Sequence, residues 1–522
     1  MATAPVVHLN RTEKGFAAVR NEMHQTETPQ SLLDYSELVA ELRNNFHTRK
    51  SYSYEYRVRE LNNLRRGIVE LQEEICAAVN KDLRKHIVEA YQGEILSIVT
   101  EIDFALNHLK EWMAPTKAST PLIAQPGSVV VNKQPKGVVL VIAPWNFPIS
   151  LCFVPVVNAI SAGCSVVVKP SEMTPESAKI IDRITKQYLD PDLFRCVLGG
   201  VHETTELLKQ KWNHIFYTGN GAVGRIVAKA AAENLASYTL ELGGKSPAYI
   251  AEDANVRVAA RRVLGTKLFN NGQVCVAPDY VLVHEKVQKQ FLDELKAHYE
   301  KTVGSNPIEN QSLSRIVNER HFDRVAGLLK ENHGGQVVLG GLDKAVRNEK
   351  FIPTTVVLNP SLDSSMMHEE IFGPVLPVLT VKGMDDALKI INTKESSLAS
   401  YIYTESNDKA DKFVKFTNSG GTCVNESIFH VAVNEVPFGG HSGGGSGVGS
   451  YHGLAGFNEF THFRTVLNHR TWMDPDNRYP PYNAKDIKIF KLLYVEGIPD
   501  HVKLGLKLLA AGAAISLIRS NL

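Results

Sequence analysis

Hydrophobic positions change their spacing along the chain, and this change divides a helical N-terminal part from a mixed remainder. Between Leu32 and Trp112, apolar residues recur every three or four positions, the spacing that brings side chains onto one face of a helix. The clearest run of this kind consists of Val58, Leu61, Leu64, Ile68 and Leu71. The sequence therefore predicts a helical block that ends at the prolines beginning with Pro115, followed by a hairpin-like segment near Ser128–Asn132.

From Gly137 onward, short apolar runs alternate with helical stretches. Such runs are typical of parallel strands that are buried on both faces. We expect strands at Val138–Ile142, Val166–Val168, His214–Tyr217, Tyr238–Leu240, Tyr280–Val283, Val337–Leu339, Thr354–Leu358, Val378–Val381 and Tyr401–Thr404. The alternation favours doubly wound sheets with crossover helices, and its two successive sets favour two α/β domains.

Composition and charge narrow the class of protein without defining its chemistry. The chain has 522 residues, of which 43% are hydrophobic and 22% charged, and its net charge is +1. This composition is typical of a soluble globular protein, and the absence of a basic excess argues against nucleic acid as a partner. The six cysteines form no Cys-x-x-Cys pair, so we expect no metal site and a reducing, intracellular environment. Residues 1–29 lack the apolar core of a secretory signal.

One cysteine lies in a segment that suits a covalent catalyst. Cys275 belongs to the polar, glycine-containing segment Asn270–Pro278, and Glu241 lies upstream in Leu240–Pro247. Covalent catalysis needs a thiolate, an orienting base and a donor for the developing oxyanion. Cys275 and Glu241 are candidates for the first two.

A glycine pattern indicates a dinucleotide site. Gly219, Gly221 and Gly224 form a G-x-G-x-x-G motif between a predicted strand and a helix expected over Arg225–Leu235. Glycines allow close approach of a pyrophosphate, and a helix N-terminus favours its negative charge. The motif alone also fits a tight strand–helix turn without a ligand. Its associated rule of an acidic residue about 20 positions later would assign Glu241 to a ribose rather than to catalysis.

Five segments carry a resemblance when they are taken together. They are Pro144–Pro148, Lys169–Glu172, Leu240–Pro247, Asn270–Pro278 and Glu370–Pro374. In this order they resemble the aldehyde dehydrogenase superfamily, most closely its class 3 and fatty aldehyde dehydrogenase branch, over roughly residues 35 to 480. The resemblance implies an α/β fold with a Rossmann-like cofactor domain, a second α/β catalytic domain and a small oligomerisation hairpin or arm.

The resemblance also implies how the chain is divided. The expected parts are an N-terminal extension at 1–34, an NAD(P)-binding domain at 35–242 that includes part of the oligomerisation hairpin near 115–135, a catalytic domain at 243–430, a return segment and oligomerisation arm at 431–480, and a basic and apolar tail at 481–522.

Residue roles follow from the resemblance as expectations. Cys275 is the implied nucleophile, Glu241 the base for the hydrolytic water, and Asn146 the side-chain donor to the oxyanion. Phe438 is expected to line the substrate tunnel, and Lys245 to serve structure. The cofactor is implied to be NAD, with NADP possible, bound by Lys169, Glu172, Gly219, Gly221, Gly224, Glu370 and Phe372. A carboxylate at the ribose would repel a 2′-phosphate, which favours NAD modestly.

Two segments depart from the pattern or extend it. Val436–Gly453 carries about two more residues than the family has between its Pro-Phe-Gly-Gly and Tyr-His-Gly landmarks, and we expect the extra glycines to loosen this loop. Leu504–Ile518 is apolar except for Lys507 and Ser516, and basic residues flank it. It is shorter than the ~20 residues of a spanning helix, so attachment to an anionic membrane surface is favoured. The alternative is a helix that docks on a partner subunit or over the active-site funnel.

The leading interpretation is NAD(P)-dependent oxidation of a hydrophobic, long-chain aliphatic aldehyde to its carboxylic acid through a cysteine thiohemiacetal and thioester. Aromatic or apocarotenoid aldehydes are an alternative substrate class, and a CoA-acylating enzyme or an inactive NAD-binding scaffold is an alternative function. A homodimer is expected. The C-terminus would hold it at the cytoplasmic face of the endoplasmic reticulum, a lipid droplet or the mitochondrial outer membrane, with a soluble cytoplasmic protein as the alternative.

Overall fold

The computed structural model describes residues 34–491 and residue 494. The predicted N-terminal extension and the apolar part of the predicted C-terminal tail therefore lie outside the described residues. Among the helices of the described part, none has the length and apolar character needed to cross a membrane.

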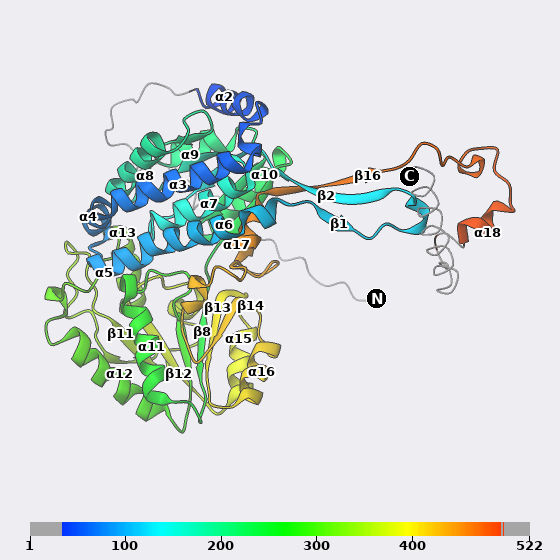
Figure 1. Cartoon of the computed structure of the whole chain (residues 1–522). Coiled ribbons are helices and arrows are strands. Elements are labelled where there is room, and N and C mark those ends of the chain that lie inside the picture. The colour runs from blue at the N-terminus through cyan, green and yellow to red at the C-terminus, as the bar shows by residue number, and fades with distance from the viewer. Residues whose placement is uncertain (1–33, 492–493, 495–522) are drawn as a thin grey trace, which may run out of the picture.

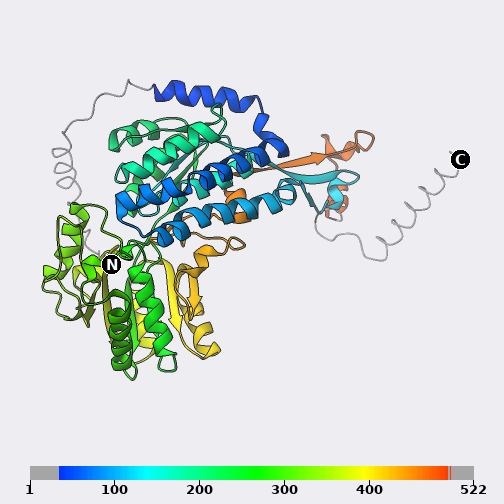
Figure 2. The same cartoon turned by 60° about the vertical axis from the view of Figure 1, so that its left-hand side comes forward.

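Helices make up the N-terminal part and cover the sheets of the remainder (Figures 1 and 2). In chain order they are α2 (Tyr35–His47), α3 (Tyr54–Glu70), α4 (Gln72–Leu83), α5 (Ile87–Ala90), the π-helical η2 (Tyr91–Leu96), α6 (Ser97–Met113), α7 (Ser150–Ala162), α8 (Pro175–Tyr188), α9 (Val201–Leu208), α10 (Gly221–Glu233), α11 (Val256–Leu268), α12 (Gln288–Val303), α13 (Glu319–Lys330), α14 (Ser365–His368), α15 (Met384–Asn392), α16 (Asn407–Phe416), α17 (Gly453–Glu459) and α18 (Asp486–Lys491).

The first sheet is the Rossmann-like one. Its strands lie in the order β15 (Gly447–Val448), β7 (Ser237–Glu241), β6 (His214–Thr218), β3 (Val138–Ile142), β4 (Ser165–Lys169) and β5 (Phe194–Cys196). All neighbours are parallel except β15. Successive side chains of a strand point to opposite faces, and accordingly Val139 and Val141 join one core while Val138 and Leu140 join another. Burial on both faces explains why these strands read as unbroken apolar runs.

The second sheet has the order β10 (Gln336–Leu339), β11 (Thr355–Leu358), β12 (Val375–Val381), β9 (Tyr280–His284), β8 (Pro247–Ile250), β13 (Ser397–Tyr403) and β14 (Ser419–Val424). Only β10 pairs antiparallel to its neighbour within this sheet. Helices α11 and α12 pack on one face, and α13, α15 and α16 on the other.

A third, smaller sheet projects from the body (Figures 1 and 2). It consists of β1 (Thr116–Ala118), β2 (Ser128–Pro135) and β16 (Thr461–Asn468), all antiparallel. The pairing of β2 with β16 runs from Ser128 opposite Asn468 to Pro135 opposite Thr461, so the predicted hairpin segment is joined by a strand from near the C-terminal end.

These sheets confirm the predicted fold class. The predicted strands are present, whereas the expected helix Arg225–Leu235 begins earlier, at Gly221, because the side chain of Asn220 accepts the N–H of Val223 and caps it. The domain boundaries stay a prediction.

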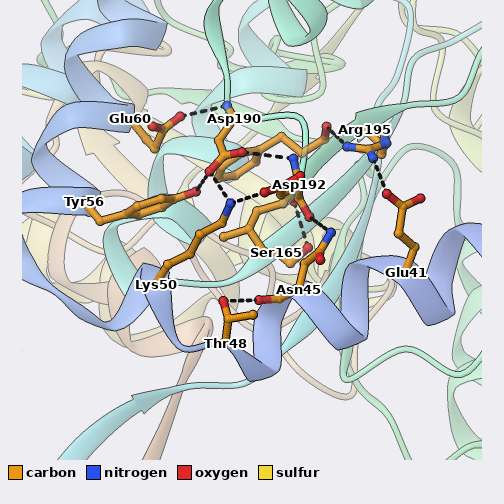
Figure 3. A network of polar contacts seen from close by, with 12 residues as sticks. Glu41, Asn45, Thr48, Lys50, Tyr56, Glu60, Ser165, Asp190, Asp192 and Arg195 are labelled. Carbon is orange, nitrogen blue, oxygen red and sulfur yellow. Dashed lines mark hydrogen bonds and ion pairs between the residues drawn. The ribbon is translucent and has the colours of Figure 1, made fainter.

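An acidic side chain attaches the N-terminal helices to the Rossmann-like sheet (Figure 3). Asp190, which precedes β5, accepts hydrogen bonds from Tyr56 Oη at 2.8 Å and Lys50 Nζ, also at 2.8 Å. Glu60 of α3 accepts the backbone N–H of Asp190 at 3.0 Å. These contacts fix α3 against the loop that leads into the sheet.

A second buried carboxylate joins three distant segments. Glu101 of α6 accepts hydrogen bonds from Asn158 Nδ2 of α7 at 2.6 Å and from the N–H of Gly453 at 2.7 Å. Its other oxygen lies 3.3 Å from Nδ1 of His452. Because Glu101 is fully buried, each of these donors would lose its partner if the carboxylate were removed.

We therefore expect Glu101→Ala to lower the free energy of unfolding by about 3 kcal/mol, since it leaves several buried donors without an acceptor. Thermal and urea unfolding of both proteins measure the change. The matched control is Glu74→Ala, whose half-exposed ion pair with Arg183 is expected to contribute less than about 1 kcal/mol. Equal losses for the two variants would contradict the role assigned to Glu101.

Candidate active site

The carboxyl ends of the parallel Rossmann-like strands open into one cavity of about 1310 Å³. Ile142 ends β3, Lys169 ends β4, Thr218 ends β6 and Glu241 ends β7, and all four line this cavity. Ligands of open α/β sheets bind at this edge because the loops that follow the strands converge there. Cys275 lines the same cavity.

The turn that carries Cys275 has an unusual backbone. Asn270, Asn271 and Gly272 have φ angles of 47°, 53° and 72°, in the left-handed region that asparagine and glycine tolerate best. A Cβ on Gly272 would lie 2.3 Å from the carbonyl oxygen of Gly373, so only glycine fits there. The side-chain amide of Gln273 donates to the carbonyl of Asn270 at 3.0 Å and closes the turn.

Burial acts against ionisation of the Cys275 thiol. It raises the pKa to about 12, and the nearby carboxyl groups of Glu370 and Glu241 add to the increase. The thiol form is therefore the stable one in the structure described here. A thiolate is formed only when the developing charge gains a donor or the proton gains a base.

Glu241 lies at the end of β7 with its carboxyl group buried, and neither oxygen has a hydrogen-bond partner within residues 34–491. Burial, followed by the charge of Glu459, raises the pKa of Glu241 well above its usual value. A carboxyl group of this kind accepts a proton near neutral pH more readily than an exposed one.

Asn146 lies on the loop between β3 and α7 and is buried. Its Nδ2 donates to the carbonyl of Gln273 at 3.1 Å, two residues before Cys275. A side-chain amide has two N–H donors, so one remains for a ligand. The contact brings the predicted oxyanion donor against the turn of the predicted nucleophile.

Glu370, on the segment between α14 and β12, also lines the cavity beside Cys275. A Cβ on Gly243 would lie 2.3 Å from its Oε2, so the missing side chain of Gly243 makes room for the carboxyl group. Burial raises the pKa of Glu370 to about 8, with a further contribution from Asp279. Lys245 forms an ion pair with Asp279 and donates to the carbonyl of Met366 at 2.7 Å, which fixes the segment that carries Glu370.

The predicted cofactor residues surround the other part of the cavity. Lys169 is buried, and its Nζ lies 3.6 Å from a carboxylate oxygen of the half-exposed Glu172. Burial lowers the pKa of Lys169, and Glu172 partly offsets this. Both residues line the cavity together with Gly219 and Gly221. The lysine, the carboxylate and the N-terminus of α10 suit the hydroxyls and pyrophosphate of a dinucleotide, so the residues present fit such a cofactor.

The remaining predicted residues divide between the cavity and the core. Phe372 lines the cavity, and its ring meets Trp145 edge to face at 5.3 Å. Gly224 instead lies behind it, where a Cβ would come within 3.0 Å of Leu242, so it permits close packing of α10 on the sheet. Phe438 is buried against Tyr451 at 5.6 Å between ring centroids and does not line this cavity, so its tunnel role stays a prediction.

One part of the glycine-rich loop Val436–Gly453 is held more closely than the sequence predicted. The extra glycines were expected to loosen it, but Gly447 pairs with Glu241, and Ser446 accepts the N–H of Leu242 at 3.1 Å. A Cβ on Gly447 would lie 1.9 Å from the carbonyl oxygen of Leu240. Glycine here allows β15 to lie close against β7.

Sequence reasoning missed one buried cation beside the site. Lys267 of α11 is fully buried, its Nζ has no hydrogen-bond partner in the described part of the chain, and burial lowers its pKa to about 8. A signal existed, because Lys267 falls on the same helical face as Val263 and Leu264, which are apolar and buried.

Comparison with known proteins places the chain in a family. The model of the aldehyde dehydrogenase family matches residues 22–466. The chain is 41% identical to aldehyde dehydrogenase family 3 member H1 of Arabidopsis thaliana, over 90% of this chain and 96% of that protein. It is 40% identical to aldehyde dehydrogenase family 3 member A2 of Mus musculus, over 92% of this chain and 98% of that one.

Solved structures agree with this result. The substrate-bound AldH of Staphylococcus aureus has a TM-score of 0.82 and 36% sequence identity, and the match covers 86% of this chain and 98% of that one. The chain belongs to the aldehyde dehydrogenase family, and it is similar to several of its family 3 members. It is an NAD(P)-dependent enzyme that oxidises aldehydes.

The high pKa of Cys275 predicts slow and steeply pH-dependent alkylation. Below its pKa the thiolate fraction rises about tenfold per pH unit, so the rate with iodoacetamide in cofactor-free enzyme is expected to rise without a plateau between about pH 7 and 10. Mass spectrometry of the Cys275 peptide measures the rate, and Cys275→Ala gives the background from other cysteines. A plateau near pH 8.5, the usual range of a free thiol, would contradict the assignment.

Proposed function

We propose that this enzyme oxidises a hydrophobic, long-chain aliphatic aldehyde to the carboxylic acid through a thiohemiacetal and a thioester on Cys275. The observation that carries the proposal is the convergence of Cys275, Glu241 and the Asn146 loop at the carboxyl edge of the Rossmann-like sheet.

In the first half-reaction, the sulfur of Cys275 attacks the aldehyde carbon, and the thiol proton passes to the carboxylate of Glu241, which then releases it to water. The free N–H of the Asn146 amide and the backbone N–H of Cys275 stabilise the oxyanion that forms on the former carbonyl oxygen. The nicotinamide, when bound, supplies the acceptor at C4 for the hydride that leaves this carbon. The acyl group then remains on Cys275 as a thioester.

In the second half-reaction, Glu241 takes a proton from water. The hydroxide oxygen bonds to the acyl carbon, the carbon–sulfur bond breaks, the sulfur of Cys275 takes the proton from Glu241, and the carboxylic acid leaves. The raised pKa of Glu241 supports this role, because a carboxylate with a higher pKa is a stronger base. The presence of Glu241 also argues against the CoA-acylating alternative, in which a thiol replaces water.

For the cofactor we propose that Lys169 and Glu172 hold the adenosine ribose, Gly219 and Gly221 admit the pyrophosphate, and Glu370 and Phe372 lie at the nicotinamide end. Glu172 favours NAD over NADP because a carboxylate repels a 2′-phosphate. The similar aldehyde dehydrogenase of Canis lupus familiaris, named dimeric and NADP-preferring, supports NADP as a second cofactor.

The choice of a hydrophobic substrate rests on the surroundings of Cys275. This residue packs against the main apolar core, which includes Phe147 and Phe438. The rings of Phe147 and Phe269 stack with their centroids 5.6 Å apart. Such aromatic surfaces fit an apolar chain, and they also fit the aromatic or apocarotenoid aldehydes that remain the alternative substrates.

We also propose a homodimer and contact with a membrane. The projecting sheet of β1, β2 and β16 supports the dimer, because β16 exposes Phe463 and Leu467 to about half of their surface. The name of the canine relative supports it too. Membrane contact rests on the sequence of the C-terminal tail, whose apolar part lies outside the described residues, so a soluble cytoplasmic enzyme is the competing outcome.

We expect purified enzyme to form NADH from hexadecanal and NAD, and Cys275→Ala to abolish this formation because no thioester can form. Glu241→Gln is expected to retain a single burst of NADH and to lower steady turnover by roughly a hundredfold or more, the usual range for a general base. Absorbance of NADH under pre-steady-state and steady-state conditions measures both.

Different outcomes identify which part fails. Turnover with benzaldehyde or an apocarotenal, but not with hexadecanal, would keep the cysteine mechanism and overturn the substrate class. Undiminished turnover by Cys275→Ala would overturn the mechanism. Absence of turnover with every aldehyde and both cofactors would favour the inactive scaffold.

A further inference from the structure

A buried ion pair lies directly behind the loop that carries Asn146. Lys85 follows α4 and Glu94 belongs to η2, and both side chains are fully buried, with 2.8 Å between Nζ and Oε1. Neither residue carries a role in the mechanism above.

The ammonium group of Lys85 has three donors, and the structure accounts for all of them. One contacts Glu94, and a second donates to the main-chain carbonyl of Asn146 at 2.7 Å. The third is available to the ring of Phe147, whose centroid lies 3.8 Å from Nζ. Lys85 is thus committed to two successive residues of the Asn146 loop.

The carboxylate of Glu94 holds the other end of the same loop. While Oε1 pairs with Lys85, Oε2 accepts the backbone N–H groups of Ile149 and Ser150 at 3.1 and 3.0 Å. Ser150 begins α7, where the positive end of the helix dipole also favours a carboxylate. The ion pair therefore holds the loop at two points, at Asn146 and where the loop leads into α7.

Further hydrogen bonds connect the Asn146 loop to the turn that carries Cys275. The side-chain amide of Asn270 donates to the carbonyl of Asn146 at 2.7 Å and to the carbonyl of Gln273 at 3.1 Å. The Asn146 amide donates to that same Gln273 carbonyl. The carbonyl that Lys85 contacts is thus part of a continuous chain of hydrogen bonds leading to the residues just before Cys275.

From this geometry we infer that Lys85 and Glu94 are positioning residues that set the direction of the Asn146 amide toward the oxyanion. The inference rests on the role proposed for Asn146. A fully buried ion pair gains little net stability, because removing both charges from water offsets their attraction. Its fixed directions suit it to orient the peptide groups to which it bonds, and a misplacement of about 1 Å in a catalytic group costs up to a hundredfold in rate.

The test combines Lys85→Met and Glu94→Gln with Asn146→Ala in a double-mutant cycle. Each positioning variant is expected to lower kcat for aldehyde oxidation about tenfold or more, while KM for aldehyde and NAD changes little. In enzyme that already carries Asn146→Ala, the same substitutions are expected to lower kcat no further, because the donor they orient is absent. The rate of the pre-steady-state NADH burst should follow kcat.

Glu94→Gln is nearly isosteric and keeps an acceptor oxygen, so this variant alone tests the inference if Lys85→Met does not fold. The matched control is Arg57→Met, which removes another buried cation that donates to main-chain carbonyls, those of Ser51 and Ser161, at the far end of α7. It should lower the melting temperature and leave kcat close to that of the wild type.

Two results would overturn the inference and leave the proposed function intact. One is a double variant whose decrease in kcat equals the product of the decreases in the two single variants. The other is an unchanged kcat in Glu94→Gln. An unchanged kcat in Asn146→Ala alone would instead remove the oxyanion role on which both rest.

Discussion

Desolvation around Cys275 is the constraint on which the rest of the site depends. Burial raises the pKa of the thiol, of Glu241 and of Glu370 together, and the carboxyl groups reinforce the increase at the thiol. Negative charge is therefore costly everywhere in this part of the cavity. Negative charge can form only on an atom that accepts a hydrogen bond as the charge develops. The amide of Asn146 is placed to donate this hydrogen bond.

The same constraint explains how the two sheets meet. The Rossmann-like sheet brings Glu241 and the Asn146 loop to its carboxyl edge, whereas Cys275 and Glu370 lie on segments that adjoin the second sheet. Close approach of these segments requires Gly243 and Gly272, whose missing side chains make room for Glu370 and for the carbonyl of Gly373.

The sequence predicted those features that depend on local pattern. Strands buried on both faces, such as β3 and β4, are unbroken apolar runs and were found. Strands β8 and β14 were missed because one is short and begins with proline, and the other opens with serine and glycine. Cys275, Glu241 and Asn146 were selected from motifs and their family resemblance. Nothing local marks Lys85 or Glu94 as buried, since the burial of a charge is decided by partners that lie far away in the chain.

The N-terminal helical part therefore contacts the site more extensively than its sequence indicates. Besides the ion pair of Lys85 and Glu94, Glu89 of α5 accepts the N–H of Asn270 at 2.9 Å and the hydroxyl of Ser314 at 3.0 Å. One short stretch of chain between α4 and α6 thus contacts both the loop of the oxyanion donor and the turn of the nucleophile. Because both contacts come from one short segment, its position bears on both loops at once. The direct hydrogen bonds between the Asn146 loop and the turn of Cys275 then join the two loops to each other.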